Sequence, residues 1–248
     1  MVCSKDIASL YKSTYENYKE NNHEFIRVDS DCERRLPSRS ADSIKKWFYF
    51  GEMAHIQEKI FNDINLKVKS ICTEKDDLFK IHFDYVKEII INFAKEQNIV
   101  DNEKKATIVE IDFKNIFYNN NNLDNYIESI NKKINENSDE TIQYVYVVFR
   151  NDGMVVVVGQ TSTLKNSDLF KLLDTRGLTG SANIILRKEF GNELFEKFDH
   201  LLTNYYSKAW VFADPNNIKN IKECESNLGE YLKEKGVPIL NNYSHLYN

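Results

Sequence analysis

The sequence predicts a mixed α/β (α+β) protein. A helical N-terminal module at residues 1–100 precedes a domain at residues 105–248, which is built on a small antiparallel three-stranded sheet flanked by helices. Three observations indicate this fold. Apolar residues recur at helical spacing through much of the first 97 positions, two apolar runs flank a turn within Tyr144–Gln160, and a polar stretch at residues 98–105 separates the two patterns.

The clearest local signal is a β-hairpin. Two apolar runs, Tyr144–Phe149 and Met154–Val158, flank a polar segment that ends in Asp152-Gly153. An Asp-Gly pair in this place favours a tight primed turn, because glycine tolerates the positive φ that such a turn needs. Both alternating faces of each strand are apolar, which predicts helices on both sides of the sheet.

Helical periodicity predicts three helices in the N-terminal module, at residues 5–20, 42–61 and 77–97. The aromatic run Trp47–Phe50 in the second helix is too apolar for a free surface. It either fills a core or contacts the C-terminal domain or a second subunit.

The second domain supplies the remaining elements. A strand at residues 107–113 and a helix at 123–134 either extend the sheet or connect the two domains. After the hairpin we expect helical segments at 181–190 and 194–202, a third strand at 205–212 and a final helix that carries Glu225.

Glu225 falls on the apolar side of this last helix. At about 100° per residue it shares a stripe with Leu228 and Leu232, whereas Glu223 and Glu230 project from the opposite face. Burial of an uncompensated carboxylate is costly. Glu225 therefore either reaches a nearby lysine or arginine, or it is a ligand of a hard divalent cation.

Four segments resemble the GIY-YIG nuclease superfamily. Tyr144-Val145-Tyr146 stands at the first tripeptide of that family, and Val157–Thr161 stands at the second tripeptide and the two residues after it. Glu225–Leu228 and Pro238–Asn241 follow in the family order of glutamate helix, proline and closing Leu-Asn. The resemblance covers about the last 105 residues, and it departs from the family at Val157, where a tyrosine is usual.

The resemblance implies a metal-dependent DNA endonuclease that hydrolyses phosphodiester bonds. Glu225 would hold a Mg²⁺ or Mn²⁺ ion as the cofactor. Tyr146 would lie near the attacking water, with Tyr144 on the same strand face as a second candidate. The other reading of Tyr146 is that its ring packs in the sheet. Because a valine transfers no proton, the protein either uses Tyr146 as the phenol for catalysis or does not cleave DNA.

Catalysis of this kind also needs a positively charged side chain that stabilises the charge on the phosphate. We expect Arg187 to supply it, with Arg176 as the fallback, while Lys165 stands where the family arginine more often lies. An arginine at an exposed helix end is the alternative interpretation of Arg187. His200 is a further candidate acid or base, although a lone histidine is more often structural.

The predicted DNA contacts are Gln160, Thr161, Lys188, Asn241, Arg34, Arg35 and Arg39. The net charge of −5 gives no global attraction to nucleic acid, so binding would depend on local basic segments. The segment Arg27–Lys46 is one such strip, and its mixed charges also fit an ordinary solvated face.

Neither a signal peptide nor a membrane-spanning stretch is predicted, so we expect a cytoplasmic protein without a membrane partner. The N-terminal module would serve target binding, specificity or dimerisation. A rival hypothesis is a catalytically inactive module of the same fold that binds DNA or protein. A protein partner of the aromatic N-terminal helices is a third possibility.

Overall fold

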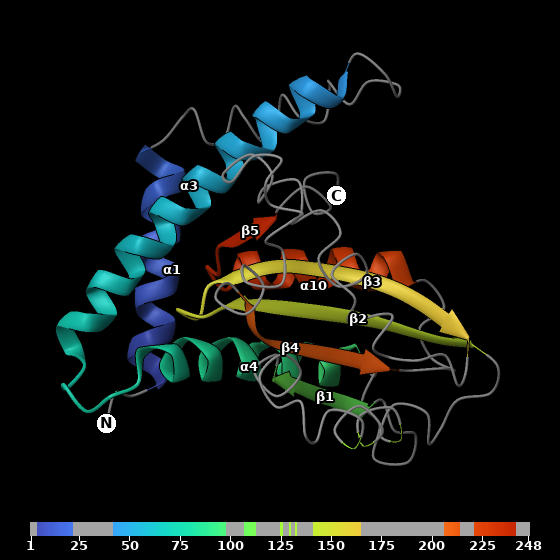
Figure 1. Cartoon of the computed structure of the whole chain (residues 1–248). Helices are drawn as coiled ribbons and strands as arrows, with labels where there is room; N and C mark the ends of the chain where they lie inside the picture. The colour runs from blue at the N-terminus through green and yellow to red at the C-terminus, as the bar shows by residue number, and fades with distance from the viewer. Residues whose placement is uncertain are drawn as a thin grey trace.

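The computed structural model describes residues 4–21, 42–97, 107–112, 141–164, 206–213 and 221–241, together with three single helical positions, Asn125, Ser129 and Lys132. These residues form long helices at the N-terminus and a sheet whose strands come from the rest of the chain (Figure 1). The mixed α+β class that the sequence predicts is confirmed.

The three N-terminal helices are α1 (Ser4–Asn21), α3 (Asp42–Ile71) and α4 (Leu78–Glu96). Each matches a predicted helix, but α3 continues past the predicted end near residue 61. The reason is that Ile64 and Val68 prolong the apolar stripe of Ile60, and all three side chains are fully buried. A helix continues as long as its buried face does.

The sheet has five strands in the order β1-β4-β2-β3-β5. They are β1 (Thr107–Asp112), β2 (Thr141–Arg150), β3 (Val155–Leu164), β4 (Tyr206–Ala213) and β5 (Ile239–Asn241). The predicted hairpin is β2–β3, and the predicted third strand, β4, pairs antiparallel with β2. The sheet is larger than the predicted three strands, because β1 pairs with β4 and β5 runs parallel to β3. Residues 107–112 therefore extend the sheet.

The hairpin turn differs from the predicted tight primed turn, which has a two-residue loop. The Arg150 amide donates to the Met154 carbonyl at 2.8 Å, and the Gly153 amide donates to the Arg150 carbonyl at 2.9 Å. Three residues thus form the loop, with Gly153 at φ +95° in the last position. Three-residue hairpin loops place a glycine of positive φ at this point. The role of Gly153 is as predicted, while the loop is one residue longer.

One hydrophobic cluster joins the helices to one face of the sheet. Val145, Val147 and Phe149 alternate along β2 and belong to the same cluster as buried residues of α1, α3 and α4 and of α10 (Ile221–Glu234). Phe83 of α4 contacts Phe149, with ring centroids 4.9 Å apart. Helices α4 and α10 also contact each other, since the rings of Phe93 and Tyr231 lie 5.5 Å apart.

The predicted division into residues 1–100 and 105–248 falls at residues 98–106, which lie outside the described residues. On either side of that segment, α1, α3 and α4 share their core cluster with β2, β3, β5 and α10. Figure 1 shows α1 and α3 at the end of the sheet that holds the β2–β3 turn. The two parts of the chain are therefore in extensive contact, and two independent domains stay a prediction.

Candidate functional site

Tyr146 packs directly on Gly159 across the hairpin. The two residues are cross-strand partners in β2 and β3. A Cβ atom added to Gly159 would lie 2.5 Å from both Cζ and Oη of Tyr146, so the ring covers the space that a side chain would occupy. Only 4% of Tyr146 is exposed. The ring is thus held against the sheet, which accords with its packing role; the predicted catalytic role of its phenol stays a prediction.

Val157 lies on the same face of the sheet as Tyr146. It pairs with Val148, which is two residues from Tyr146 along β2, and it is buried. The side chain of Val157 therefore contributes only apolar surface to this face.

Glu225 lies on α10, in the first half of the helix. It is half-buried, whereas Glu223 is exposed, and it precedes the buried Leu228 by one turn. The predicted stripe is therefore present. Glu230 is half-buried and accepts a hydrogen bond from Lys233 at 3.1 Å.

Tyr146 and Glu225 approach the sheet from different sides. Leu228 and Leu232 of α10 belong to the cluster of Val145 and Val147, whose side chains point away from the face that holds Tyr146. A site that used both groups would form around the edge of β3. Within the described residues, β5 pairs with β3 only at Val155 and Val157, so its pairing stops before Gly159.

Other predicted residues lie near this edge. Gln160 is half-buried in β3 and pairs with Val145, and Thr161 follows it opposite Tyr144. Asn241 of β5 pairs with Val157. The remaining predicted site residues lie outside the described residues: Lys165, Arg176, Arg187, Lys188, His200, Arg34, Arg35 and Arg39.

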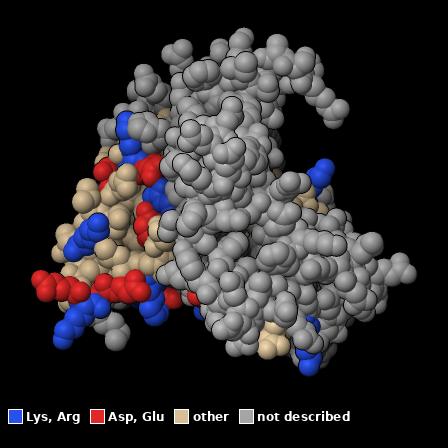
Figure 2. Space-filling model, in the orientation of Figure 1, with Lys and Arg blue, Asp and Glu red and all other residues tan. Residues whose placement is uncertain are grey.

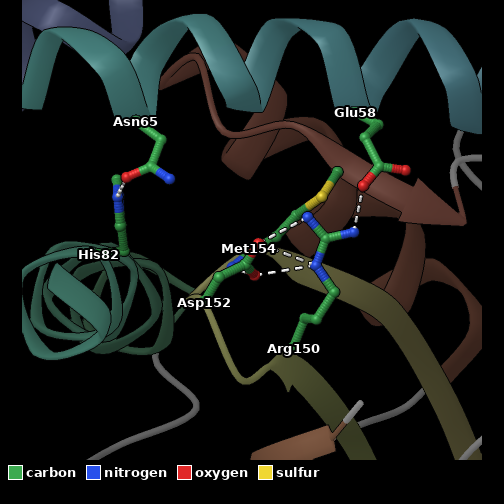
Figure 3. Close-up of polar contacts among 6 residues, drawn as sticks. All are labelled: Glu58, Asn65, His82, Arg150, Asp152 and Met154. Carbon is green, nitrogen blue, oxygen red and sulfur yellow. Dashed lines mark hydrogen bonds and ion pairs between the residues drawn. The ribbon is translucent and has the colours of Figure 1, made fainter. Parts of the chain in front are cut away.

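A charged cluster that the sequence analysis did not single out lies at the hairpin turn (Figure 3). Arg150 Nε donates to Asp152 Oδ1 at 2.9 Å, and Nη2 donates to Oδ2 at 2.6 Å. Nη1 donates to Oε1 of Glu58 on α3 at 2.5 Å. Only 9% of the Arg150 side chain is exposed. Burial alone would lower the pKa of this guanidinium, but the hydrogen bonds and charges of Asp152 and Glu58 raise it above its ordinary value.

We therefore assign Arg150 a structural role, because two carboxylates engage all three nitrogens of its guanidinium. The sequence holds one signal of this pairing, the Arg-x-Asp spacing across the turn. Glu58 lies 92 positions earlier, and no local pattern connects it with Arg150.

A second buried polar group lies beside the turn. His82 Nδ1 accepts a hydrogen bond from the Tyr11 hydroxyl at 2.6 Å, and Nε2 donates to Asn65 Oδ1 at 3.3 Å in the neutral tautomer that satisfies both contacts. Burial lowers the pKa of His82 to about 4, and the charge of Asp152 opposes this only in part. The imidazole is therefore neutral at pH 7 and links α1, α3 and α4.

Among the described residues, no three histidine, cysteine or acidic side chains gather as a metal site. None of the described helices combines the length and the apolarity needed to cross a bilayer. On the face shown in Figure 2, basic and acidic side chains of the described residues lie beside one another.

Comparison of this chain with protein-family models, with curated proteins and with solved structures finds no match.

Proposed function

We propose that this protein is a metal-dependent DNA endonuclease of the GIY-YIG type. The observation that carries the proposal is the pair Tyr146–Gly159 in the β2–β3 hairpin. Glu225 is half-buried on α10, which packs on the opposite face of the same two strands, so a site that uses both groups must form around the edge of β3. The resemblance of the four motif segments supports it. The N-terminal helices would contribute target binding, specificity or dimerisation.

We infer that Glu225 is the protein ligand of a hard divalent cation. Mg²⁺ keeps several waters and binds through one or two carboxylates together with substrate phosphates, so it does not need a cluster of protein ligands. Glu225 would hold this ion, and Mn²⁺ is the alternative cofactor. When bound, the metal supplies charge stabilisation for the phosphate and lowers the pKa of a bound water.

The protein side chains then have distinct tasks. Tyr146, fixed on Gly159, would orient the attacking water through its hydroxyl. Arg187 would stabilise the charge on the phosphate, with Arg176 or Lys165 in its place if Arg187 is structural. Arg150 is not available for this task, because Asp152 and Glu58 hold its guanidinium.

The test is cleavage of supercoiled and single-stranded DNA in Mg²⁺ or Mn²⁺ by the wild type, by Glu225→Ala and by Glu223→Ala. Glu223 is the matched control, since it lies on the same helix but is exposed. We expect Glu225→Ala to lose about 100-fold or more in rate, which corresponds to the several kcal/mol that a metal contributes. Glu223→Ala should cleave like the wild type. Full metal-dependent cleavage by Glu225→Ala would show that the metal ligand is another residue.

A second function is favoured by one specific observation. Val157 is buried beside Tyr146, at the place where the family has its second tyrosine. A catalytically inactive module of the same fold, binding DNA or protein, would need no phenol there. In that case the assay gives no cleavage with either cation, and DNA binding, where present, does not depend on metal.

A further inference from the structure

The tip of the β2–β3 hairpin is held by residues of three helices that precede Arg150 by 68 or more positions in the sequence. We call these contacts the hairpin socket: Tyr11 of α1, Glu58, Phe61 and Asn65 of α3, and Phe79 and His82 of α4. Figure 3 shows the charged part of the socket, with Glu58 descending from α3 onto the guanidinium of Arg150.

The first component of the socket is electrostatic. Arg150 is the last residue of β2, and its side chain bridges the turn residue Asp152 and the helix residue Glu58. The Arg150 guanidinium also lies 5.9 Å from the ring centroid of Phe61. With 9% of the arginine side chain exposed, removal of a carboxylate would leave a poorly solvated positive charge between α3 and the hairpin.

The second component is steric. A Cβ atom at Gly153 would lie 2.6 Å from the Cβ atom of His82, so the turn backbone rests directly on α4. His82 is in turn held by Tyr11 of α1 and Asn65 of α3 through its two ring nitrogens. The ring of Phe61 lies 4.9 Å from that of His82. A shift of any one of the three helices would therefore displace the surface that supports the turn.

We propose that the hairpin socket locks the N-terminal helices to the sheet as one cooperative unit, with Glu58 as a residue that positions the hairpin. Tyr146 lies four residues before Arg150 on the same strand, so the socket also sets the position of the Tyr146–Gly159 pair. This inference does not rest on nuclease activity. If the N-terminal helices instead formed a separable module, they would unfold independently of the sheet.

The two tryptophans allow a direct test in the full-length protein. Trp47 lies in α3 and Trp210 lies in β4. The variants Trp210→Phe and Trp47→Phe leave one fluorescent reporter each, in the helices and in the sheet. We expect the two reporters to give coincident urea transitions with the same midpoint and the same slope, the signature of one cooperative unit. Two separate transitions would overturn the proposal.

Glu58→Gln in each single-tryptophan background tests the role of Glu58. We expect both midpoints to fall by the same amount, and hydrogen exchange of the Val145–Phe149 amides to become faster in the native state. The control is Asp84→Asn, which removes the exposed helical ion pair between Asp84 and Lys80 and should leave both midpoints within error of the parent. A midpoint shift seen by Trp47 alone, or unchanged exchange of the β2 amides, would contradict the assignment.

Discussion

At the scale of the residue, His82 shows how burial selects a protonation state. The side chain is fully buried, and one ring nitrogen accepts while the other donates. Protonation would place a charge on a side chain that is shielded from water. Burial is the main reason why the pKa of His82 lies at about 4 in the folded protein; the charge of Asp152 opposes the shift and that of Lys69 adds to it.

This shift predicts a pH dependence of stability with a definite sign. The folded pKa of about 4 lies below the unfolded value of 6.5, so the unfolded chain binds more protons between these two pH values. The contribution of neutral His82 to the free energy of unfolding is fully present above pH 6.5 and is lost as the pH falls toward 4. Its size is of the order of 3 kcal/mol.

The measurement is the free energy of unfolding in urea at several pH values between 4 and 7.5, for the wild type and for His82→Gln. We expect the wild type to lose more stability than the variant over this interval, because glutamine does not titrate. Equal losses would mean that His82 is not kept neutral by the fold.

At the scale of the element, α4 connects the socket to the sheet. His82 of α4 supports the hairpin turn, and the next residue, Phe83, packs against Phe149 of β2. Its start is set locally, since Asp77 is extended and its side chain accepts a hydrogen bond from the Lys80 amide at 3.3 Å. A cap of this kind satisfies one of the free amides at a helix N-terminus.

Substitution of the N-cap residue Asp77 should destabilise the protein by an amount that depends on how well the new side chain caps α4. Asp77→Ala should lower the free energy of unfolding by about 1 kcal/mol, while Asp77→Asn should cost only a small part of that, because asparagine is as good a cap. Urea denaturation of the two variants beside the wild type measures the difference. An alanine variant as stable as the asparagine variant would show that the cap contributes little to α4.

At the scale of the whole molecule, the distribution of charged residues limits which surfaces could bind DNA. A net charge of −5 disfavours nonspecific attraction, and Figure 2 shows mixed signs on the described surface of one face. If the proposed nuclease binds DNA, local basic segments must supply the phosphate contacts. The candidates in the N-terminal half are Arg34, Arg35 and Arg39, which lie outside the described residues.

Replacement of these three arginines by glutamine should change the salt dependence of DNA binding. Each lost phosphate contact reduces the slope of log K against log salt by about 0.9, so the triple variant should lose up to about 2.7. Fluorescence anisotropy with a labelled duplex at several salt concentrations measures this slope.

The control removes the same charge from a different surface, with glutamine at the exposed positions Lys5, Lys12 and Lys19 of α1. It should leave the slope close to that of the wild type. A slope that changes equally in both triple variants would show that the arginine segment has no particular role in DNA binding.

Much of the local structure follows from the sequence alone. The helical stripes predicted α1 and α4 closely, and the alternation around Asp152-Gly153 predicted the hairpin. The stripe through Leu228 also predicted that Glu225 would lie on the buried side of α10. These features depend on residues a few positions apart, whose periodicity is visible in the chain itself.

The proposed catalytic assignments are of a different kind. The role of Tyr146 rests on motif resemblance, whereas Glu225 is indicated both by the resemblance and by its place on an apolar helix stripe. The chemical roles of both residues stay predictions. What the structure adds is that Tyr146 covers Gly159, which depends on the register between β2 and β3. Register is set by pairing across strands, so no single strand determines it.

The amino-acid sequence by itself determined the mixed α/β class, the hairpin and its glycine, and the apolar side of the Glu225 helix. Only the tertiary structure decided the parallel pairing of β5, the addition of β1 and the meeting of Glu58 with Arg150. The physical reason is distance along the chain. Contacts between residues far apart in sequence form when whole apolar faces pack together, and such contacts leave no periodic trace in either segment.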